Sequence, residues 1–593
     1  MKTRIISTGI LIFWICILAS SPSFSQTKIQ GKVVDTETNQ PISYVSICFQ
    51  GTNNGTISNA DGCFRFILKE EAPKELIFSC IGYETRKINI DNGVPAKIQM
   101  SKAIYSLRTL EIMGTKPDHD PTELFYLAVK NAKKNKQLRS ARSYLSLETL
   151  GSDDVPIEVL EAFYQSDYSI KHGLSEMNLK NGRFGMMDQD GQYFSSLQTT
   201  LMLTNYELFL QARKSYYPYS PFSLSKSQGE EQYIFNLEKV IHNHEELIAV
   251  INFIPRSGDQ KLFGGQAFIN MNDHQFRQIK MHIENSEQVP FAPISPIASL
   301  DGVNLDLTLN FRTDTEGKIM YDYILFNYDF DYVKPDQRES MTTEALLVFY
   351  DYEQAFLMPM CNAMELTTDY EKIMATPFHT YFWEQNYIYA QTKAMKDHTE
   401  YFIDNGVVIN YEELCVDHKP VNNPIKVWSE TDPISWDDFL IKDMKDLKID
   451  TPRFTWNYQS LHPESPVNLD FHIFLDCNIE GDSLYFCCRT VFNRKASYYF
   501  DKKDSMALAY INLQFDLVES VRRKMAESLC KRKIKIDNIG EIENVYQDYT
   551  KRLDKMMFSM LKDVQRGNNQ VKLAEWKQKV SADLNRTTAQ LTP

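Results

Sequence analysis

The sequence lacks the motifs by which most catalytic sites are recognised. It contains no Gly-x-Ser-x-Gly, Gly-x-Gly-x-x-Gly or Walker loop, so serine hydrolase, dinucleotide-binding and phosphate-cradling classes lose their main evidence. No Cys-x-x-Cys pair occurs, which leaves a zinc ribbon or a thioredoxin-like redox site unsupported. Excess positive charge is also missing. The formal net charge of -14 argues against a nucleic-acid partner, because neutralising phosphates requires clustered Lys and Arg.

Long hydrophobic runs are missing after the first residues of the chain. Lys2 and Arg4 precede an apolar run over 5–18, and small residues then favour signal-peptidase cleavage before Gln26. Cys16 lies inside this run and is expected to be removed with it. The run is too short to favour a permanent membrane anchor, and no later stretch is long enough to span a bilayer. We therefore expect a protein secreted across the inner membrane, soluble in the periplasm or at the outer-membrane periphery.

Cysteines are present in an odd number once the signal peptide is removed. Cys487 and Cys488 are adjacent, and Cys477 precedes them across an expected turn at 480–483. A hairpin disulfide from Cys477 to one of the two is one expectation for an oxidising compartment. For most of the other cysteines we expect buried free thiols.

The segment 31–90 carries the clearest pattern in the chain. Short runs of Val, Ile and Phe alternate there with the turn-forming pairs Asn54-Gly55 and Asp61-Gly62, which are typical of tight turns between antiparallel strands. The pattern resembles the carboxypeptidase-like regulatory domain, a small transthyretin-like β-sandwich that opens many cell-envelope proteins of Bacteroidetes-type bacteria. This resemblance implies a non-catalytic accessory domain over 27–105.

A helix and then a strand-rich region are expected over 120–357. Asp120 is the expected N-cap of the helix, with Pro121 at its first position and Glu123 at its third. Alternating apolar segments follow and predict antiparallel hairpins; they are 246–253, 265–271, 276–283, 305–311 and 318–326.

The hairpin at 265–283 is similar to one in periplasmic lipoprotein carriers, whose half-barrel covers a hydrophobic cavity. Any large antiparallel sheet would give the same alternation, and we favour that simpler interpretation.

The remainder of the chain is expected to contain a connecting region over 358–424 and an α+β domain over 425–593. The aromatic residues of 378–383 are expected to fill an interdomain surface. Helices are predicted at 505–531, 541–566 and 571–584. Together with the β-rich composition, in which 12% of residues are aromatic, these elements predict a multidomain α+β fold. The overall order is a signal peptide over 1–25, a β-sandwich, a central antiparallel domain and a mainly helical C-terminal domain.

Scattered positions of the C-terminal domain resemble a family of secreted bacterial proteins believed to be zinc proteases. They are Trp436, Asn493, Arg494, Phe515, Asp516, Glu519 and Trp576. In that family His-Glu-x-x-His places two zinc ligands and a general base on one helix face. Here Tyr510 and Gln514 replace the histidines and Ile511 replaces the glutamate.

A tyrosine and a neutral amide are poor zinc ligands, and isoleucine accepts no proton. A second family pattern would fall on 560–567, where Gly567 alone is retained and Arg566 stands in place of a histidine. No histidine follows His472. The resemblance therefore implies a pseudoprotease domain with no catalytic residue, metal or cofactor.

Two further clusters of polar residues have simpler interpretations than a metal site or a catalytic site. His242, His244, Glu245 and Glu246 lie before a β segment, and a solvated turn is favoured over a metal site. Asp437 and Asp438 are a candidate carboxylate pair but are expected to cap the following element.

The basic run comprises Arg522, Arg523, Lys524, Lys531, Arg532, Lys533 and Lys535. We interpret it as a solvated helix face, with contact to anionic lipid or an acidic partner as the alternative.

The sequence thus predicts a non-catalytic envelope protein with an interaction or scaffolding role. Its partner is an unidentified envelope protein or hydrophobic ligand. The alternative is a periplasmic carrier of a hydrophobic ligand or lipoprotein, which would use a cavity in the central domain. A hydrolase with a site that sequence cannot assemble is the least favoured class.

Overall fold

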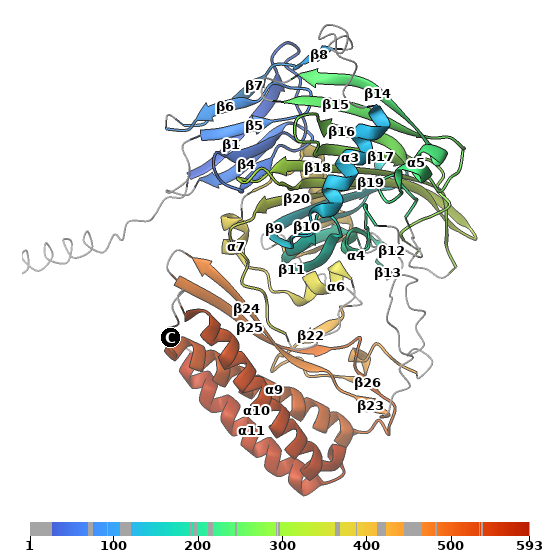
Figure 1. Cartoon of the computed structure of the whole chain (residues 1–593). Coiled ribbons are helices and arrows are strands. Elements are labelled where there is room, and N and C mark those ends of the chain that lie inside the picture. Colours follow the sequence, from blue (N-terminus) through green and yellow to red (C-terminus); the bar gives the residue numbers. More distant parts are fainter. Residues whose placement is uncertain are drawn as a thin grey trace, which may run out of the picture.

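The chain forms a β-sandwich, a large central sheet and a C-terminal α+β region, so the predicted multidomain α+β class is confirmed (Figure 1). The computed structural model describes residues 27–591, apart from segments at 69–74, 92, 107–119, 190–191, 194–198, 211–216, 243–245, 292, 294–296, 362–367, 387, 412–422, 444–464, 481–482, 533 and 535–537. The expected signal peptide over 1–25, and with it Cys16, lies outside the described residues.

The N-terminal sandwich consists of two small sheets packed over one core. One sheet has the order β4-β1-β7 and the other β3-β2-β5-β6. Val33, Val45, Ile47, Phe64 and Phe78 fill the space between them and are almost fully buried. Its strands are β1 (Thr27–Asp35), β2 (Ser46–Phe49), β3 (Gly55–Ile57), β4 (Cys63–Leu68), β5 (Glu75–Ser79), β6 (Arg86–Asn89) and β7 (Lys97–Met100).

The central sheet has twelve strands in the order β21-β11-β10-β9-β20-β19-β18-β17-β16-β15-β14-β8, and every pair of neighbours is antiparallel. All five segments predicted as strands lie in it. The strands are β8 (Ile104–Ser106), β9 (Arg139–Leu150), β10 (Pro156–Ser169), β11 (Gly173–Met186), β14 (Tyr233–His242), β15 (Leu247–Pro255), β16 (Gly264–Asn270), β17 (Phe276–Ile283), β18 (Ser299–Thr313), β19 (Ile319–Lys334), β20 (Gln337–Asp351) and β21 (Val407–Ile409).

Both faces of this sheet are covered. Successive side chains of a strand point to opposite faces, so Tyr144 and Leu145 of β9 belong to different apolar clusters. The Leu145 face packs against α3 (Pro121–Lys134), α4 (Thr199–Thr204) and the segment around Phe222. The Tyr144 face packs against Ile57 of the sandwich and Phe382 of α7 (Thr380–Gln385).

The start of α3 differs in one detail from the prediction. Asp120 occupies the N-cap position and Pro121 the first helical position, but the Asp120 side chain makes no capping hydrogen bond. The amphipathic pattern is confirmed, because Leu124, Phe125 and the small residues at the same spacing are buried against the sheet. Packing of the apolar face therefore holds this helix in place without help from its cap.

The segment after β20 returns to the central sheet before entering the C-terminal region. α6 (Asp369–Ala375) and α8 (Lys393–Asn405) contact the strands at its β11 edge, α7 covers the Tyr144 face, and β21 then pairs with β11. Gly406, at the end of α8, lies so close to β11 that an added Cβ would meet the Met186 carbonyl oxygen at 2.4 Å. Part of the expected connecting region is thus an edge of the sheet.

In the C-terminal region α9 packs against a small antiparallel sheet, and α10 and α11 pack against α9 (Figure 1). α9 is buried at Tyr510, Leu513, Leu517, Val521 and Met525, a spacing that places these residues on the face toward β24, β25 and α10. The predicted helices are all present. The elements are β22 (Ile425–Val427), β23 (Val467–Asn468), β24 (Phe471–Glu480), β25 (Ser483–Asn493), β26 (Tyr498–Tyr499), α9 (Ser505–Arg532), α10 (Gly540–Val564) and α11 (Gln570–Leu591). Within the described residues, no helix is both long enough and apolar enough to cross a membrane.

Candidate functional site

The positions of the absent zinc motif lie in the interior of the C-terminal region. Tyr510, Ile511 and Gln514 of α9 are exposed by 1%, 0% and 6%. Gln514 Nε2 donates a hydrogen bond of 2.7 Å to Tyr510 Oη. Burial raises the pKa of Tyr510 to about 12, so this side chain is a neutral phenol at physiological pH. The two side chains thus bind each other where the resembled family would bind a metal.

Two carboxylates follow on the same helix, and each is held by a protein donor. Trp428 Nε1 donates to Asp516 Oδ1 at 2.9 Å, and burial raises the pKa of this carboxyl. Glu519 accepts from Arg522, Arg523 and Thr490. Burial raises the pKa of Glu519, but these hydrogen bonds outweigh it and hold the pKa below its usual value.

The same contacts correct one prediction about the basic run. Arg522 and Arg523 were expected on a solvated face, yet both point to the buried Glu519 and their side chains are only 16% and 13% exposed. A carboxylate buried on α9 requires a cationic partner, and these two arginines are within one turn of it. Lys533 and Lys535 lie outside the described residues.

The histidine-rich candidates do not form a ligand set in the described part of the chain. Among described residues, no group of three or more His, Cys, Asp or Glu side chains is arranged to hold a metal ion. His472 Nε2 lies 2.8 Å from Asp470 Oδ1, and Glu246 binds Arg277. His244 and Glu245 lie outside the described residues.

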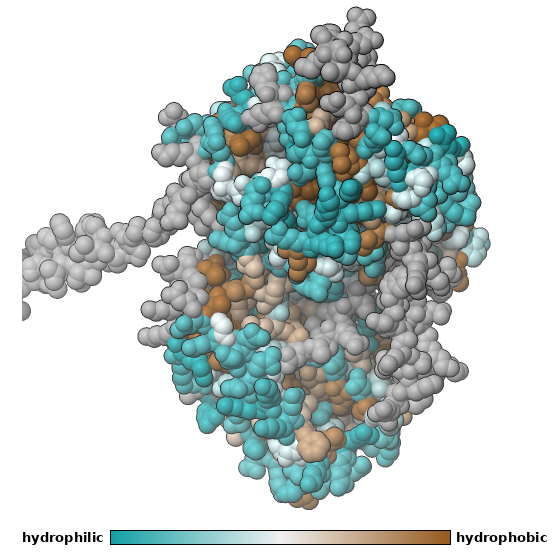
Figure 2. Space-filling model, viewed as in Figure 1, coloured by the Kyte–Doolittle hydropathy of each residue, from teal (hydrophilic) through white to brown (hydrophobic). Residues whose placement is uncertain are grey.

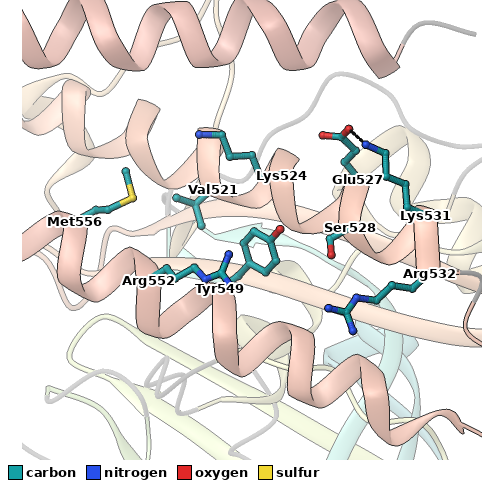
Figure 3. A pocket seen from close by; sticks show the side chains of 9 residues that line it. All are labelled: Val521, Lys524, Glu527, Ser528, Lys531, Arg532, Tyr549, Arg552 and Met556. Carbon is teal, nitrogen blue, oxygen red and sulfur yellow. Dashed lines mark hydrogen bonds and ion pairs between the residues drawn. The ribbon is translucent and has the colours of Figure 1, made fainter.

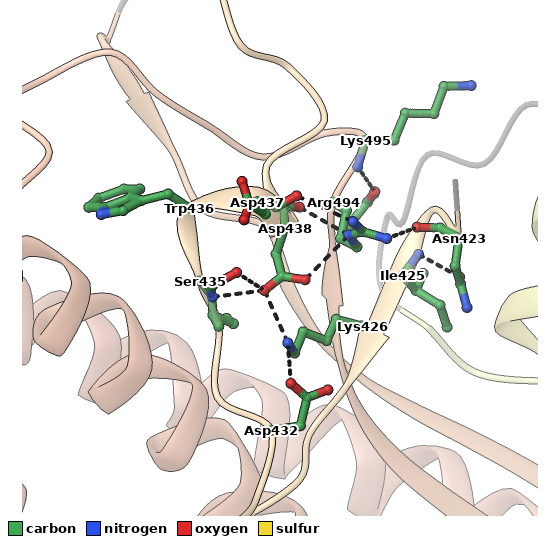
Figure 4. Close-up of polar contacts among 12 residues, drawn as sticks. Asn423, Ile425, Lys426, Asp432, Ser435, Trp436, Asp437, Asp438, Arg494 and Lys495 are labelled. Carbon is green, nitrogen blue, oxygen red and sulfur yellow. Dashed lines mark hydrogen bonds and ion pairs between the residues drawn. The ribbon is translucent and has the colours of Figure 1, made fainter. Parts of the chain in front are cut away.

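Asp437 and Asp438 do not act as a pair (Figure 4). Asp438 accepts from the Ser435 backbone N–H at 2.7 Å and from Lys426 Nζ at 3.0 Å. Arg494 Nε lies 3.6 Å from its other oxygen. Asp437 points to solvent, and its side chain is fully exposed.

Asp438 therefore closes its own turn, Trp436–Asp438, rather than capping the following element as the sequence suggested. The turn brings Lys426 and Arg494 to one carboxylate, and this network joins β22 to the end of β25.

A buried ion pair joins the central sheet to the C-terminal region. Lys180 of β11 lies with its Nζ 2.5 Å from Asp476 Oδ1 of β24, and both side chains are 1% exposed. Lys180 also donates to the carbonyl oxygens of Leu357 and Cys477, each at 2.7 Å. Burial lowers the pKa of Lys180, whereas Asp476 opposes this effect. No sequence pattern indicated this pair, because its members are 296 positions apart.

Further contacts at this junction are made through the backbone and through aromatic rings. Met360 and Leu475 exchange two backbone hydrogen bonds of 2.8 and 2.9 Å. The ring centroid of His379 lies 6.4 Å from that of Tyr485 in β25, so the aromatic segment 378–383 lies between the two bodies as expected. Figure 2 shows hydrophobic surface gathered at the waist between the two bodies. Near the end of β24, Ile479 is 42% exposed.

The expected hairpin disulfide is not formed. Cys477, Cys487 and Cys488 are free thiols. The register of β24 and β25 places Phe486 opposite Cys477, so neither of the two adjacent cysteines faces it directly. The expectation failed because the sequence fixes the turn but not which residues become cross-strand neighbours.

The inner face of the central sheet is filled by the chain's own aromatic side chains. Phe125 of α3 packs against Phe222, Phe253 and Phe276, with ring centroids 5.0, 6.0 and 6.4 Å away, and all four are fully buried. These residues occupy the place where the carrier interpretation requires a ligand.

A groove opens between α9 and α10 at the surface of the C-terminal region (Figure 3). Its volume is about 450 Å³, and it is lined by Val521, Lys524, Glu527, Ser528, Lys531, Arg532, Tyr549, Arg552 and Met556. We call it the α9–α10 groove. Lys531 is paired with Glu527 and Lys524 with Asp583 of α11. The predicted basic run therefore contributes three of the nine lining residues, and sequence reasoning missed the contribution of α10.

Comparison with solved structures gives only weak likenesses. A structure of MucB is 10% identical over 39% of this chain and 93% of its own, with a TM-score of 0.17. A putative outer membrane lipoprotein-sorting protein domain from Vibrio parahaemolyticus is 9% identical over 38% and 90%, with a TM-score of 0.18. A LolA superfamily protein from Nitrosomonas europaea is 10% identical over 38% and 93%, with a TM-score of 0.15. Scores this low carry no argument about fold or function.

Comparison at the level of sequence supports one region of the chain. No curated protein matches the chain. Residues 29–110 match the family model described as CarboxypepD_reg-like domain, and this range contains the two small sheets with their common core. The N-terminal β-sandwich is thus similar to the CarboxypepD_reg-like domain.

Proposed function

We propose that this chain is a non-catalytic protein of the cell envelope with an interaction or scaffolding role. In this proposal it is secreted across the inner membrane and works in the periplasm or at the outer-membrane periphery. Its C-terminal region would be a pseudoprotease, a zincin-like scaffold without metal chemistry.

The observation that carries the proposal is the hydrogen bond between Gln514 and Tyr510. Both side chains are buried and face each other at 2.7 Å. A neutral phenol and a neutral amide joined by this one hydrogen bond supply neither a metal ligand set nor a general base. Ile511, which is fully buried, occupies the position of the activating glutamate.

The joints between the bodies support a scaffolding role. Arg312 of β18 donates to the Asn53 carbonyl oxygen of the sandwich at 2.7 Å, and Lys180 links the sheet to β24. Ile57 of β3 is fully buried against the sheet. Such contacts fix the relative positions of three surfaces, which is the requirement for presenting several partners at once.

Elemental analysis of the purified protein tests this proposal. We expect substoichiometric zinc in the wild type and in Y510A and Q514A variants, and in A509S as a control on the exposed side of the same helix. One zinc per chain in wild type and A509S that is lost in Y510A or Q514A would contradict the pseudoprotease.

The carrier alternative rests on the central sheet. Its inner face is apolar over many strands and is covered by α3, whose Phe125 lies at the centre of an aromatic cluster. A ligand would enter only if this helix moved aside. Native mass spectrometry distinguishes the scaffolding role from the carrier role. If the protein is a carrier, we expect the mass of the chain with a co-purifying lipid; if it is a scaffold, we expect the mass of the chain alone.

A further inference from the structure

Cations are concentrated on one surface of an otherwise acidic molecule. Lys551, Arg552, Lys555 and Lys562 are exposed on α10, and Arg532 of α9 lies across the groove from Arg552. None of these five forms an ion pair with another described residue, whereas the chain as a whole carries a formal net charge of -14. An uncompensated group of this kind attracts an anionic partner.

The spacing along α10 places these cations beside an exposed aromatic ring. Lys551, Lys555, Phe558 and Lys562 follow one another at intervals of four, three and four residues, which align on one face of an α-helix. Phe558 is 71% exposed. The opposite face of the helix, at Leu553, Met560 and Val564, is buried in the C-terminal core.

The α9–α10 groove borders this face. Arg552 lines the groove (Figure 3), and Lys551 and Lys555 of the outer face lie within one turn of it on α10, so the two sets of cations are close together on the same helix. Inside the groove, the guanidinium groups of Arg532 and Arg552 and the Ser528 hydroxyl are hydrogen-bond donors. Arginine is suited to phosphate because its planar fork donates two parallel hydrogen bonds.

Carboxylates on the same surface leave part of this charge uncompensated. Glu527 and Asp583 each take up one lysine, and Asp548 and Asp554 are exposed on α10. Asp563 is engaged by Trp576 Nε1 at 3.0 Å. The cations of the groove and of the outer face of α10 still outnumber these acidic groups.

We propose that this surface binds the phosphate-bearing head groups of an anionic phospholipid membrane. The groove takes one head group, the α10 lysines contact its neighbours, and the apolar ring of Phe558 inserts at the boundary between head groups and acyl chains. Charge complementarity and the exposed ring argue together for a membrane surface. The inference adds a partner to the proposed envelope function and does not depend on whether the C-terminal region binds zinc.

Sedimentation with phospholipid vesicles tests the proposal on the full chain. Vesicles containing phosphatidylglycerol are expected to bind the protein at low salt, and pure phosphatidylcholine vesicles are not. High salt is expected to weaken the binding, because it screens exposed charges.

Three variants locate the surface. R552Q/K555Q is expected to lower partitioning at least about tenfold, since each basic residue near an anionic surface contributes roughly a fivefold factor. F558S is expected to weaken binding while leaving its salt dependence unchanged. K130Q/K396Q, at exposed lysines of α3 and α8, is the matched control and is expected to bind as the wild type does.

Several outcomes would overturn the proposal. It fails if wild type does not sediment with anionic vesicles, or if R552Q/K555Q binds as well as K130Q/K396Q. Stoichiometric binding of inorganic phosphate without vesicle binding would instead identify a soluble phosphate site. Circular dichroism of each variant establishes that its fold is intact, and zinc analysis of the same samples tests the proposed function separately.

Discussion

Lys180 and Asp476 form an ion pair 296 positions apart in sequence, with Nζ and Oδ1 2.5 Å apart and both side chains almost inaccessible to solvent. Each charge has lost its hydration and depends on the other, together with the two carbonyl oxygens that Lys180 contacts. The pair lies where β11 of the central sheet meets β24. It therefore couples the folding of one body to the placement of the next.

Removing one member of this pair should destabilise the protein strongly. We expect K180M and D476N each to lower the free energy of unfolding by about 3 to 5 kcal/mol, because each leaves a buried charge uncompensated. The double variant should cost less than the sum of the two, and urea denaturation measures this coupling. K318M removes the exposed pair of Lys318 with Glu316 and is the control, with an expected cost below about 1 kcal/mol. Additive losses at the two junction positions would contradict direct coupling.

Asp438 and Asp437 provide a second comparison, between adjacent residues of the same type. D438A removes the acceptor shared by Ser435, Lys426 and Arg494 and should cost about 2 to 4 kcal/mol. D437A changes a fully exposed side chain and should stay within about 0.5 kcal/mol of wild type. Thermal unfolding of the two variants measures the difference. Equal stabilities would mean that the network around Asp438 contributes little.

The two carboxylates of α9 should affect acid stability in opposite directions. The pKa of Glu519 is held below the ordinary value of 4.5 by its arginine and threonine donors, against the effect of burial. Its stabilising contribution is therefore present above about pH 4.5 and is lost as the pH falls through the lower folded pKa. E519Q should remove this loss and flatten the acid side of the stability profile.

Asp516 should show the reverse sign. Burial raises its pKa above 3.8, so its contribution is complete below that value and is lost as the pH rises through the folded pKa. D516N should remove this fall, and thermal midpoints measured between about pH 3 and pH 6 compare the two variants. Profiles of the same slope for E519Q and D516N would contradict the assignment.

Local sequence patterns predicted most of the helices and strands. The features that were not predicted depend on contacts between residues far apart in the sequence. The helix at 505–531 was predicted to within one residue of α9, because its apolar residues recur at helical spacing. The return of 407–409 to the sheet edge carried no such signal. The prediction for Arg522 and Arg523 was wrong because a run of charged residues is typical of a solvated helix face. The sequence does not show that Glu519 is buried and pairs with both arginines. The basic surface was predicted only in part. The charge run of α9 was recognised in the sequence, but the groove also requires residues of α10, which were not.

Among the described glycines of the central sheet, Gly265 leaves the least room for an added Cβ. A Cβ added there would lie 1.9 Å from the Lys280 carbonyl oxygen, a backbone atom of the neighbouring strand β17. G265A should therefore force the two strands apart, because no side chain can move aside to make room. G258A is the matched control: it lies in the turn before β16, and its added Cβ would meet nothing within 4 Å. We expect G265A to lose several kcal/mol or fail to fold, and G258A to remain within about 1 kcal/mol of wild type. Equal thermal midpoints would show that the strands tolerate a methyl group at this position, and hence that the sheet is looser than its register implies.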